Sequence, residues 1–216
     1  MSDSTMWDVR YREDGHAYGT APSLYLVEKK ELLKPGQCAA LPADGSGRNA
    51  VWLAERGLKA LSIDFSREAQ DRARQLAAER GVKVAFELAD VGEWAWPAES
   101  FDWVISIYCH HAEEDRARIH AAMFNSLKPG GYFLLEGFHA DQLRYQSGGP
   151  RDRSKLLTEE NLRADFADAE ILEVRKDLVE LNESRLHRGP GVLMRMLAKR
   201  RMAHGDSGGI ERCVIC

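Results

Sequence analysis

The sequence predicts an α/β protein in which one mostly parallel sheet is covered by helices on both faces. Strand-like and helix-like segments alternate along the chain, and several apolar runs have the length of buried strands. A glycine-rich turn also stands between the first expected strand and the first expected helix, at residues 45–50. A helix that follows each strand returns the chain to the same end of the sheet, so neighbouring strands run parallel. We therefore expect a single doubly wound sheet.

The first half of the chain predicts three strands with two helices between them. Strands are expected at Gln37–Pro42, at Lys59–Ile63 ending at Asp64, and at Val82–Leu88, with helices at Arg48–Arg56 and after Ser66. The second helix has apolar residues at positions i, i+4, i+7 and i+8, starting from Ala69. Ser66 is a favourable N-cap, and Gly81 is a favourable residue just beyond the end.

The second half predicts four further strands. These are Phe101–Tyr108, Tyr132–Phe138, Ile171–Leu181 and Gly191–Lys199, with helices expected after Glu113 and from Thr158 to Phe166. Phe101–Tyr108 is apolar almost throughout, which is typical of a central parallel strand. Lys128–Gly131 is expected to be a turn, and the last two strands are expected to form a hairpin. Residues 139–157 form an expected loop long enough to indicate a lid or binding segment.

Composition and charge indicate a globular protein with no nucleic-acid or membrane partner. The chain has 216 residues, of which 44% are hydrophobic and 30% charged, as in ordinary folded enzymes. The net charge is −4, so no excess of positive charge is available to neutralise phosphates. No apolar stretch approaches the roughly 20 residues of a membrane span, residues 1–5 lack a signal-peptide core, and four cysteines do not make a disulfide scaffold. We expect a cytoplasmic monomer or homodimer.

Three regions are expected along the chain. Residues 1–30 are predicted to be an irregular N-terminal lid segment, since they precede the first strand but contain several aromatic residues. Residues 31–201 form the main domain, and residues 202–216 a flexible tail. Cys213 and Cys216 in that tail have C-x-x-C spacing and formally fit a prenylation signal. One pair supplies only two metal ligands, so we expect no metal site.

The turn at residues 45–50 has the form G-x-G-x-x-A, which suits close approach of the backbone to a nucleotide. By itself it fits a tight strand-to-helix turn equally well. Two acids strengthen the binding interpretation. Asp64 lies 19 residues beyond Gly45 at the end of the second strand, where a carboxylate can accept hydrogen bonds from ribose hydroxyls. Asp90 follows the third strand, where it can accept from an adenine amino group. Together they predict a nucleoside-binding crevice at the carboxyl edge of the sheet.

Several short motifs extend this prediction over residues 6–200. They are Trp7-Asp8-Val9-Arg10-Tyr11, Tyr18-Gly19-Thr20, the run from Gly45 to Ala54, Ile63-Asp64-Phe65-Ser66, Ala89-Asp90, Leu127-Lys128-Pro129-Gly130-Gly131 and Leu186-His187-Arg188. With these motifs the chain resembles the class I S-adenosylmethionine-dependent methyltransferases, of the small bacterial type that includes the tellurite-resistance methyltransferases. The resemblance implies a Rossmann-like sheet of about seven strands with an antiparallel last strand. It also implies S-adenosyl-L-methionine as cofactor and S-adenosyl-L-homocysteine as its product.

The resemblance further implies a set of cofactor-binding residues. They are Arg10, Tyr11, Ala43, Gly45, Gly47, Asn49, Asp64, Phe65, Asp90, Val91 and Ile107. The glycines would lie against the methionyl part, and Asp64 would hold the ribose with Phe65 against the adenine. Asp90 and Val91 would recognise the adenine edge, and Ile107 would lie near the sulfonium. Arg10 and Tyr11 would close over the methionyl carboxylate, unless this segment is merely packed by Trp7.

The sequence departs from the family at the end of the first strand. The family has an acid there that fixes the amino group of the cofactor, whereas this chain has Leu41 and Pro42, followed by Ala43 and Asp44. Asp44 is the candidate substitute, and weaker binding is the alternative. An inactive or regulatory cofactor-binding homologue is therefore a rival hypothesis. An NAD-dependent oxidoreductase is a second rival, because residues 45–50 also fit its motif, but the chain lacks a second nucleotide-binding half.

Four residues are candidates for the catalytic side of the site. Tyr108 ends the fourth expected strand, where the resemblance places it near the sulfonium, and His110 follows that strand. His110 is a candidate base or hydrogen-bond donor, or else a loop histidine satisfied by the backbone. His187 and Arg188 connect the last two strands, as a cationic pair for an anionic nucleophile or as a solvated basic loop. We expect methyl transfer to a small molecule, either a thiol or a tellurite- or selenite-type oxyanion, because no basic face or large insertion suits a macromolecule.

Overall fold

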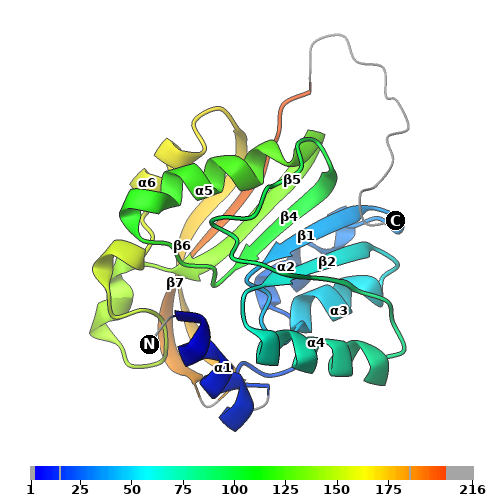
Figure 1. Cartoon of the computed structure of the whole chain (residues 1–216). Coiled ribbons are helices and arrows are strands. Elements are labelled where there is room, and N and C mark those ends of the chain that lie inside the picture. The colour runs from blue at the N-terminus through cyan, green and yellow to red at the C-terminus, as the bar shows by residue number, and fades with distance from the viewer. Residues whose placement is uncertain (1–2, 15, 185, 203–216) are drawn as a thin grey trace.

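The computed structural model describes residues 3–14, 16–184 and 186–202, and a seven-stranded sheet runs through it (Figure 1). The strand order is β3-β2-β1-β4-β5-β7-β6. The strands are β1 (Cys38–Pro42), β2 (Lys59–Asp64), β3 (Ala85–Leu88), β4 (Phe101–Ile107), β5 (Leu127–Phe138), β6 (Glu170–Ser184) and β7 (His187–Lys199). β1 to β5 are parallel, and β7 is antiparallel to both β5 and β6. The predicted fold class is confirmed, including the antiparallel last strand and the closing hairpin.

Helices cover both faces of the sheet. They are α1 (Asp3–Asp14), α2 (Leu24–Glu28), α3 (Arg48–Ala54), α4 (Arg67–Glu79), α5 (Glu113–Asn125) and α6 (Glu159–Asp165), with short 3₁₀ turns at Lys30–Leu32, Ala140–Arg144 and Arg153–Lys155. α3 and α4 lie on one face, and α5 and α6 on the other (Figure 1). No helix among the described residues is both long and apolar enough to cross a membrane.

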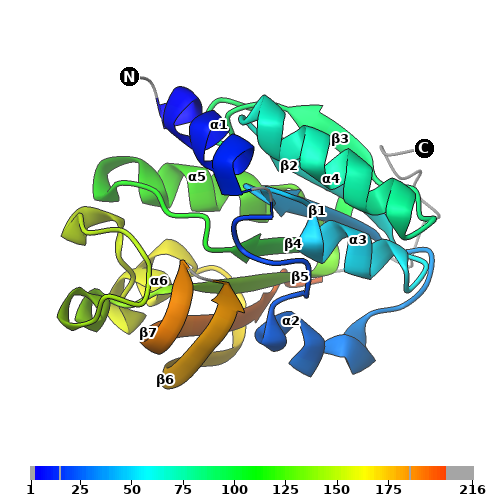
Figure 2. The same ribbon diagram turned by 90° about the horizontal axis from the view of Figure 1, so that it is seen from below.

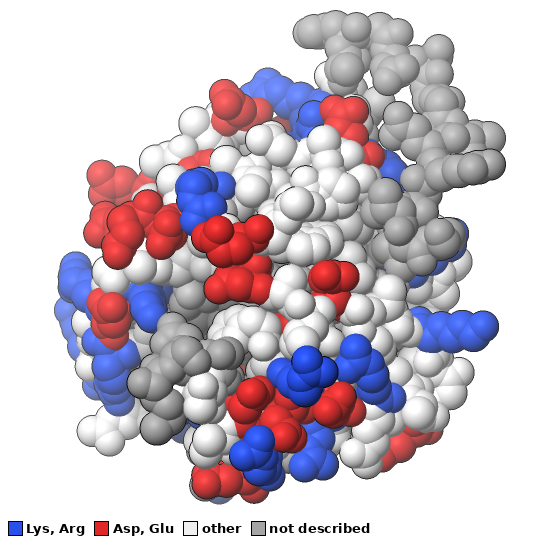
Figure 3. All heavy atoms as spheres, viewed as in Figure 1, with Lys and Arg blue, Asp and Glu red and all other residues white. Residues whose placement is uncertain are grey.

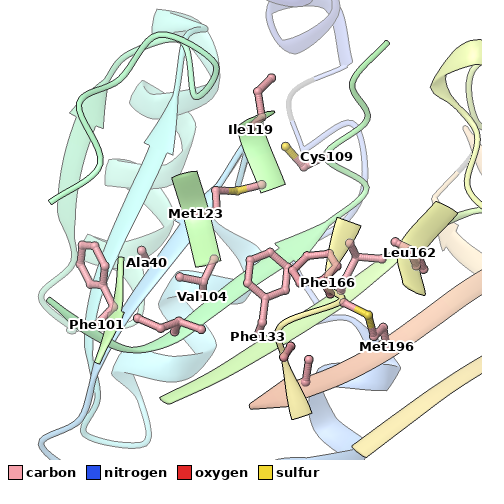
Figure 4. Packing of buried hydrophobic residues seen from close by; sticks show 14 of the residues in the cluster. Ala40, Phe101, Val104, Cys109, Ile119, Met123, Phe133, Leu162, Phe166 and Met196 are labelled. Atoms are coloured by element: carbon pink, nitrogen blue, oxygen red, sulfur yellow. The ribbon is translucent and has the colours of Figure 1, made fainter. Parts of the chain in front are cut away.

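The core follows from the alternation of side chains along the central strands. In β1, Ala39 and Leu41 pack with residues of α2 and α3, while Ala40 faces the opposite side. Figure 4 shows that opposite side, where Met123 of α5 and Phe166 beyond α6 gather with Ala40 and residues of β4, β5 and β7. β1 is buried along its whole length. A strand buried on both faces is expected at the centre of a parallel sheet, and it fixes its carboxyl end firmly.

Two helix starts are formed as the sequence predicts. The Ser66 hydroxyl accepts a hydrogen bond from the amide of Ala69 and caps α4. Thr158 and Asn161 form a reciprocal capping box at the start of α6. Such caps satisfy amide groups that have no partner inside the helix, and each contributes on the order of 1 kcal/mol.

Two local predictions are wrong. Residues 1–30 are not irregular, since α1 and α2 form there. The sequence of α1 has no apolar stripe of helical period, and the helix is held instead by packing against α4 (Figure 2). Lys128–Gly131 is not a separate turn but lies within β5, where the pairing with β4 shifts register. Cys213 and Cys216 lie outside the described residues.

Candidate active site

A cavity of about 980 Å³ lies at the carboxyl ends of β1 to β4. Ala43 and Asp44 follow β1, Asp64 ends β2, and Asp90 follows β3. Crevices at this edge, where the sheet order reverses around β1 and β4, are the usual ligand sites of doubly wound folds. The cavity predicted from the two acids is therefore present.

The glycine turn brings the backbone close to its neighbours at one side of the cavity. Gly45 and Gly47 both have positive φ, at 59° and 80°. A Cβ atom added to Gly47 would lie 2.6 Å from Cβ of Ala73 in α4, so the glycine allows α3 and α4 to pack closely. A Cβ atom at Gly45 would overlap the hydroxyl of Tyr11. Both positions thus require glycine, for conformation and for space.

Asp64 holds this turn in place. Its carboxylate accepts hydrogen bonds from the amides of Gly45 at 2.9 Å and Ser66 at 2.8 Å. Burial raises the pKa of Asp64 to about 6, against the opposing effect of these hydrogen bonds. An ionised carboxylate has about four acceptor positions, so two remain for hydroxyl groups of a ligand.

The carboxylate of Asp44 is buried and makes no hydrogen bond of ordinary geometry among the described residues, although the Ser62 hydroxyl and the Ala50 amide lie near enough to lower its pKa. Only 9% of the residue is exposed, and both carboxylate oxygens are unpartnered. Burial raises the pKa of Asp44 to about 7. A buried carboxylate without a partner is costly to the folded protein. Because Asp44 lines the cavity, a cationic group of a ligand would remove that cost.

The N-terminal helix closes the cavity over the glycine turn. Oδ1 of Asp8 accepts hydrogen bonds from the Ser66 hydroxyl and the Glu68 amide, which fixes α1 to the start of α4. The Tyr11 side chain of α1 is buried. Burial, together with the charge of Asp64, raises the pKa of Tyr11 well above the usual value. Arg10 donates to the Tyr18 hydroxyl at 3.0 Å.

The far end of the cavity has an apolar and sulfur-containing wall. Phe65, Leu88 and Val91 line it, and Oδ1 of Asp90 accepts a hydrogen bond from the amide of Gly92. Sγ of Cys109 lies 3.2 Å from Nε2 of His111. Burial raises the pKa of the Cys109 thiol to about 12 and lowers that of His111 to about 4, so both are neutral at pH 7.

Both ring nitrogens of His110 are hydrogen-bonded to backbone groups. Its Nδ1 donates to the carbonyl of Tyr108 at 2.9 Å, and its Nε2 accepts from the amide of Phe138 at 3.0 Å. Burial lowers the pKa of His110 to about 3. Both nitrogens are used, so the geometry favours the backbone-satisfied histidine over the expected base.

His187 and Arg188 point to different environments. His187 is 4% exposed and lines the cavity, and its Nδ1 lies 2.9 Å from Oε2 of Glu183. The same carboxylate oxygen accepts from Arg48 at 3.3 Å. His187 and Arg48 together lower the pKa of Glu183 although burial opposes this. Arg188 is exposed and does not line the cavity, so the expected cationic pair is not formed.

Tyr108 occupies a strained position at the end of β4. Its φ is 55°, which is unusual for a bulky residue and is most often found at functional sites. Burial raises its pKa well above the usual value. The ring stacks on Phe138 at 5.1 Å and meets His187 edge-on at 4.8 Å. These three rings form an aromatic wall beside the end of β4.

The cavity therefore gathers most of the residues named from the sequence. Those that line it are Arg10, Tyr11, Ala43, Asn49, Asp64, Phe65, Asp90, Val91, Ile107, Tyr108, His110 and His187. Gly45 and Gly47 do not line the cavity themselves, but they form the turn that carries Ser46, which does. His111 and Cys109, which follow the fourth strand and were further candidates for substrate contact, line the cavity too, whereas the sequence did not single out Arg48, the segment 149–152 or Lys155. The unusual length of the loop at 139–157 was the one signal for that segment.

Comparison with known protein families finds a match for one part of the chain that forms the cavity. Residues 43–131 match a family described as "Methyltransferase domain", and this range contains Asp44, Asp64, Asp90 and Tyr108. No curated protein matches the sequence. The resemblance to methyltransferases is thereby confirmed over the matched residues.

Solved structures share the fold across most of the chain. One, from work on the conversion of a disulfide bond into a thioacetal group during echinomycin biosynthesis, is 20% identical with a TM-score of 0.75 and 94% of both chains covered. A SAM-dependent methyltransferase from Methanosarcina mazei is 18% identical, with a TM-score of 0.69. The match covers 84% of this chain and 100% of that protein. TehB from Haemophilus influenzae is 21% identical with a TM-score of 0.69, covering 89% of this chain and 67% of its own.

Proposed function

We propose, from the methyltransferase domain at residues 43–131, that this chain transfers a methyl group from S-adenosylmethionine to a small-molecule acceptor. The observation that carries the proposal is the placement of three acids, Asp44, Asp64 and Asp90, around one cavity at the carboxyl edge of the sheet. They line it in the order in which a nucleoside with a cationic tail would need them.

The residues present suit the cofactor. The free acceptor positions of Asp64 would hold the ribose hydroxyls, and Asp90 with Phe65 would hold the adenine. Asp44, whose oxygens are unpartnered, would bind the methionyl ammonium group in place of the acid that the family has at Leu41. Arg10 lies at the lid and would meet the methionyl carboxylate. When bound, the cofactor supplies a sulfonium methyl carbon open to displacement.

The protein would promote this displacement mainly by alignment and by excluding water. The adenosine contacts fix one end of the cofactor, and Asp44 fixes the other. Ile107 and Tyr108, at the end of β4, lie between these ends and would position the methyl carbon toward the aromatic wall of Tyr108, Phe138 and His187. The acceptor would therefore enter along that wall, under the segment 149–152.

A small acceptor is favoured over a macromolecule. Figure 3 shows basic and acidic side chains mixed over the visible face, without a broad basic surface. Rings make up much of the acceptor side of the cavity, which suits an apolar or aromatic molecule carrying a nucleophilic thiol. A tellurite- or selenite-type oxyanion is the second candidate, because Arg48 and Lys155 also line the cavity.

Methyl transfer can be tested directly. The protein would be incubated with S-adenosylmethionine carrying a labelled methyl group and with a panel of thiols, phenols, amines, tellurite and selenite. Labelled product together with S-adenosylhomocysteine supports the proposal and identifies the acceptor class. Binding of the cofactor without turnover on the whole panel would favour a regulatory homologue. Calorimetric binding of NAD, with none of S-adenosylhomocysteine, would favour an oxidoreductase.

A further inference from the structure

We infer that Glu183 positions His187 as a general base, and that the acceptor is a molecule whose nucleophilic atom carries an ionisable hydrogen. The inference rests on the proposed function and names a residue pair that sequence motifs did not join. Its foundation is the hydrogen bond between the Glu183 carboxylate and Nδ1 of His187 at 2.9 Å. A carboxylate has no hydrogen to donate, so this bond places the imidazole hydrogen on Nδ1.

The second ring nitrogen is left for the cavity. His187 lines the cavity, and within the described residues no hydrogen bond reaches its Nε2. By contrast, both nitrogens of His110 bond to the backbone. Of the two histidines proposed as catalytic from the sequence, only His187 thus keeps a ring nitrogen without a hydrogen bond among the described residues, and this nitrogen lies on the side of the ring that faces Gly148. A base must lie where the proton is removed before its pKa matters.

Packing holds the His187 ring in this orientation. The ring centroid lies 4.6 Å from that of Tyr18, 4.8 Å from Tyr108 and 5.3 Å from Phe138. On the remaining side, a Cβ atom on Gly148 would come within 2.6 Å of Cδ2 of His187, so glycine is needed for the loop to pass. A ring enclosed in this way keeps its rotamer without further cost when an acceptor binds.

The charges around the pair suit a base that becomes cationic. Glu183 lies beside the imidazole and would stabilise the imidazolium that forms. Arg48 of α3 shares the Glu183 oxygen and keeps that carboxylate ionised. The other titratable groups near the ring are Tyr18, Tyr108 and His110, with Lys155 on the same cavity.

Methyl transfer to such an acceptor requires that one proton be removed from its nucleophilic atom. The hydrogen of the acceptor passes as a proton to Nε2 of His187, while the acceptor's electron pair forms the new bond to the methyl carbon. The carbon–sulfur bond breaks and its electrons return to sulfur, which leaves S-adenosylhomocysteine. The imidazolium then releases its proton to solvent. An acceptor that is already an anion has no need of this base.

Nuclear magnetic resonance of the full chain, labelled with ¹⁵N in its histidines, tests the pair without any acceptor. We expect neutral His187, assigned with a His187→Gln variant, to carry its hydrogen on Nδ1. In Glu183→Gln the Nδ1–H form should lose its dominance, because a neutral amide holds the Nδ1 hydrogen less strongly than a carboxylate does. The matched control is Glu180→Gln, an exposed glutamate of the same strand, which should leave the position of the hydrogen unchanged. Hydrogen on Nε2 in the wild-type protein would overturn the inference, even if no Glu183 variant folds.

Two thiols of different acidity test the catalytic consequence. Phenylmethanethiol is largely protonated near neutral pH, whereas benzenethiol is much more acidic and largely ionised. For Glu183→Gln we expect kcat/KM with phenylmethanethiol to fall about 100-fold or more, and with benzenethiol by less than about tenfold. Equal losses for both thiols would contradict the role of a base. Glu183→Asp should restore part of the activity, because it keeps the carboxylate.

Calorimetry with S-adenosylhomocysteine separates this inference from the proposed function. Glu183→Gln should bind with the wild-type dissociation constant, because Glu183 is not among the residues that line the cavity. If the wild-type protein binds no S-adenosylhomocysteine, the proposed function fails, while the resonance experiment still decides the state of His187. If binding is normal and the Nδ1–H form is absent, only the further inference fails.

Discussion

Asp44 and Asp64 are two acids at this sheet edge whose burial opposes their ionisation. Both are buried, and burial raises the pKa of each, to about 7 and about 6. Asp64 offsets part of its cost by binding the amides of Gly45 and Ser66, but Asp44 has no such partner among the described residues. In the unliganded protein, burial therefore favours the neutral form of Asp44 over the ionised form.

Because burial disfavours the ionised form of Asp44, the stability of the fold should depend on pH through this residue. Its pKa is higher in the folded chain than in the unfolded chain, so the neutral form stabilises the fold below about pH 4, and this contribution is lost as the pH rises through about 7. Asp44→Asn cannot ionise. We expect the stability of Asp44→Asn relative to the wild type, measured as the difference between their free energies of unfolding in urea, to increase with pH. Between pH 4.5 and pH 8 this difference should grow by about 2–4 kcal/mol. A difference between the two proteins that is the same at both pH values would refute this assignment.

Some residues of the candidate site could be predicted from the sequence. Others could not, because their contacts depend on how the backbone folds. Asp64 and Asp90 follow strands at a spacing that a nucleoside requires, so both could be named in advance. Glu183 could not, because its role depends on how far β6 extends before the hairpin turns toward His187. Whether His110 or His187 offers a free nitrogen also depends on backbone contacts formed only in the folded chain.

At the scale of elements, strand and helix order could be predicted because each apolar run has a clear period. α4 has its buried alanines on one face, a cap at Ser66 and a terminating glycine at position 81. α1 could not be predicted, because its residues show no apolar stripe. It is held by Asp8 at the start of α4 and by Tyr11 over Gly45, which are contacts between segments distant in sequence.

The joint between α3 and α4 gives a test of close packing. Gly47→Ala introduces a methyl group against Ala73 and imposes a positive φ on alanine. Gly81→Ala imposes a positive φ as well, but its added Cβ meets nothing within 4 Å. We expect Gly81→Ala to cost about 1 kcal/mol and Gly47→Ala a further 1–3 kcal/mol. Urea unfolding measures both, and equal losses would show that packing at Gly47 contributes nothing.

At the scale of the whole molecule, the cavity is assembled from distant parts of the chain. The sheet edge supplies the acids, α1 supplies Arg10 and Tyr11, and the hairpin of β6 and β7 supplies His187. Figure 2 shows α1 beside α4. The small cluster around Tyr11 is separate from the two main clusters that hold the sheet together.

This separation predicts that α1 serves binding more than folding. A chain without residues 1–14 should still fold, with a cooperative urea transition, because both main clusters remain. Its affinity for S-adenosylhomocysteine should fall about tenfold or more, through loss of Arg10 and of the cover over Gly45. Calorimetry and urea unfolding of the shortened chain measure the two effects. Undiminished affinity would show that α1 is not a lid for the cofactor.

The most direct test of the account is the binding of S-adenosylhomocysteine to the wild-type protein, to Asp64→Ala and to Asp71→Ala. Asp71 is the matched control, an acid on α4 whose side chain is 63% exposed and does not line the cavity. Isothermal titration should show saturable binding to the wild type and to Asp71→Ala with equal dissociation constants. Asp64→Ala should lose about 1–3 kcal/mol of binding free energy, because buried polar groups lose their partners. An absence of binding by the wild type, or unchanged binding by Asp64→Ala, would contradict the assignment of this cavity to the cofactor.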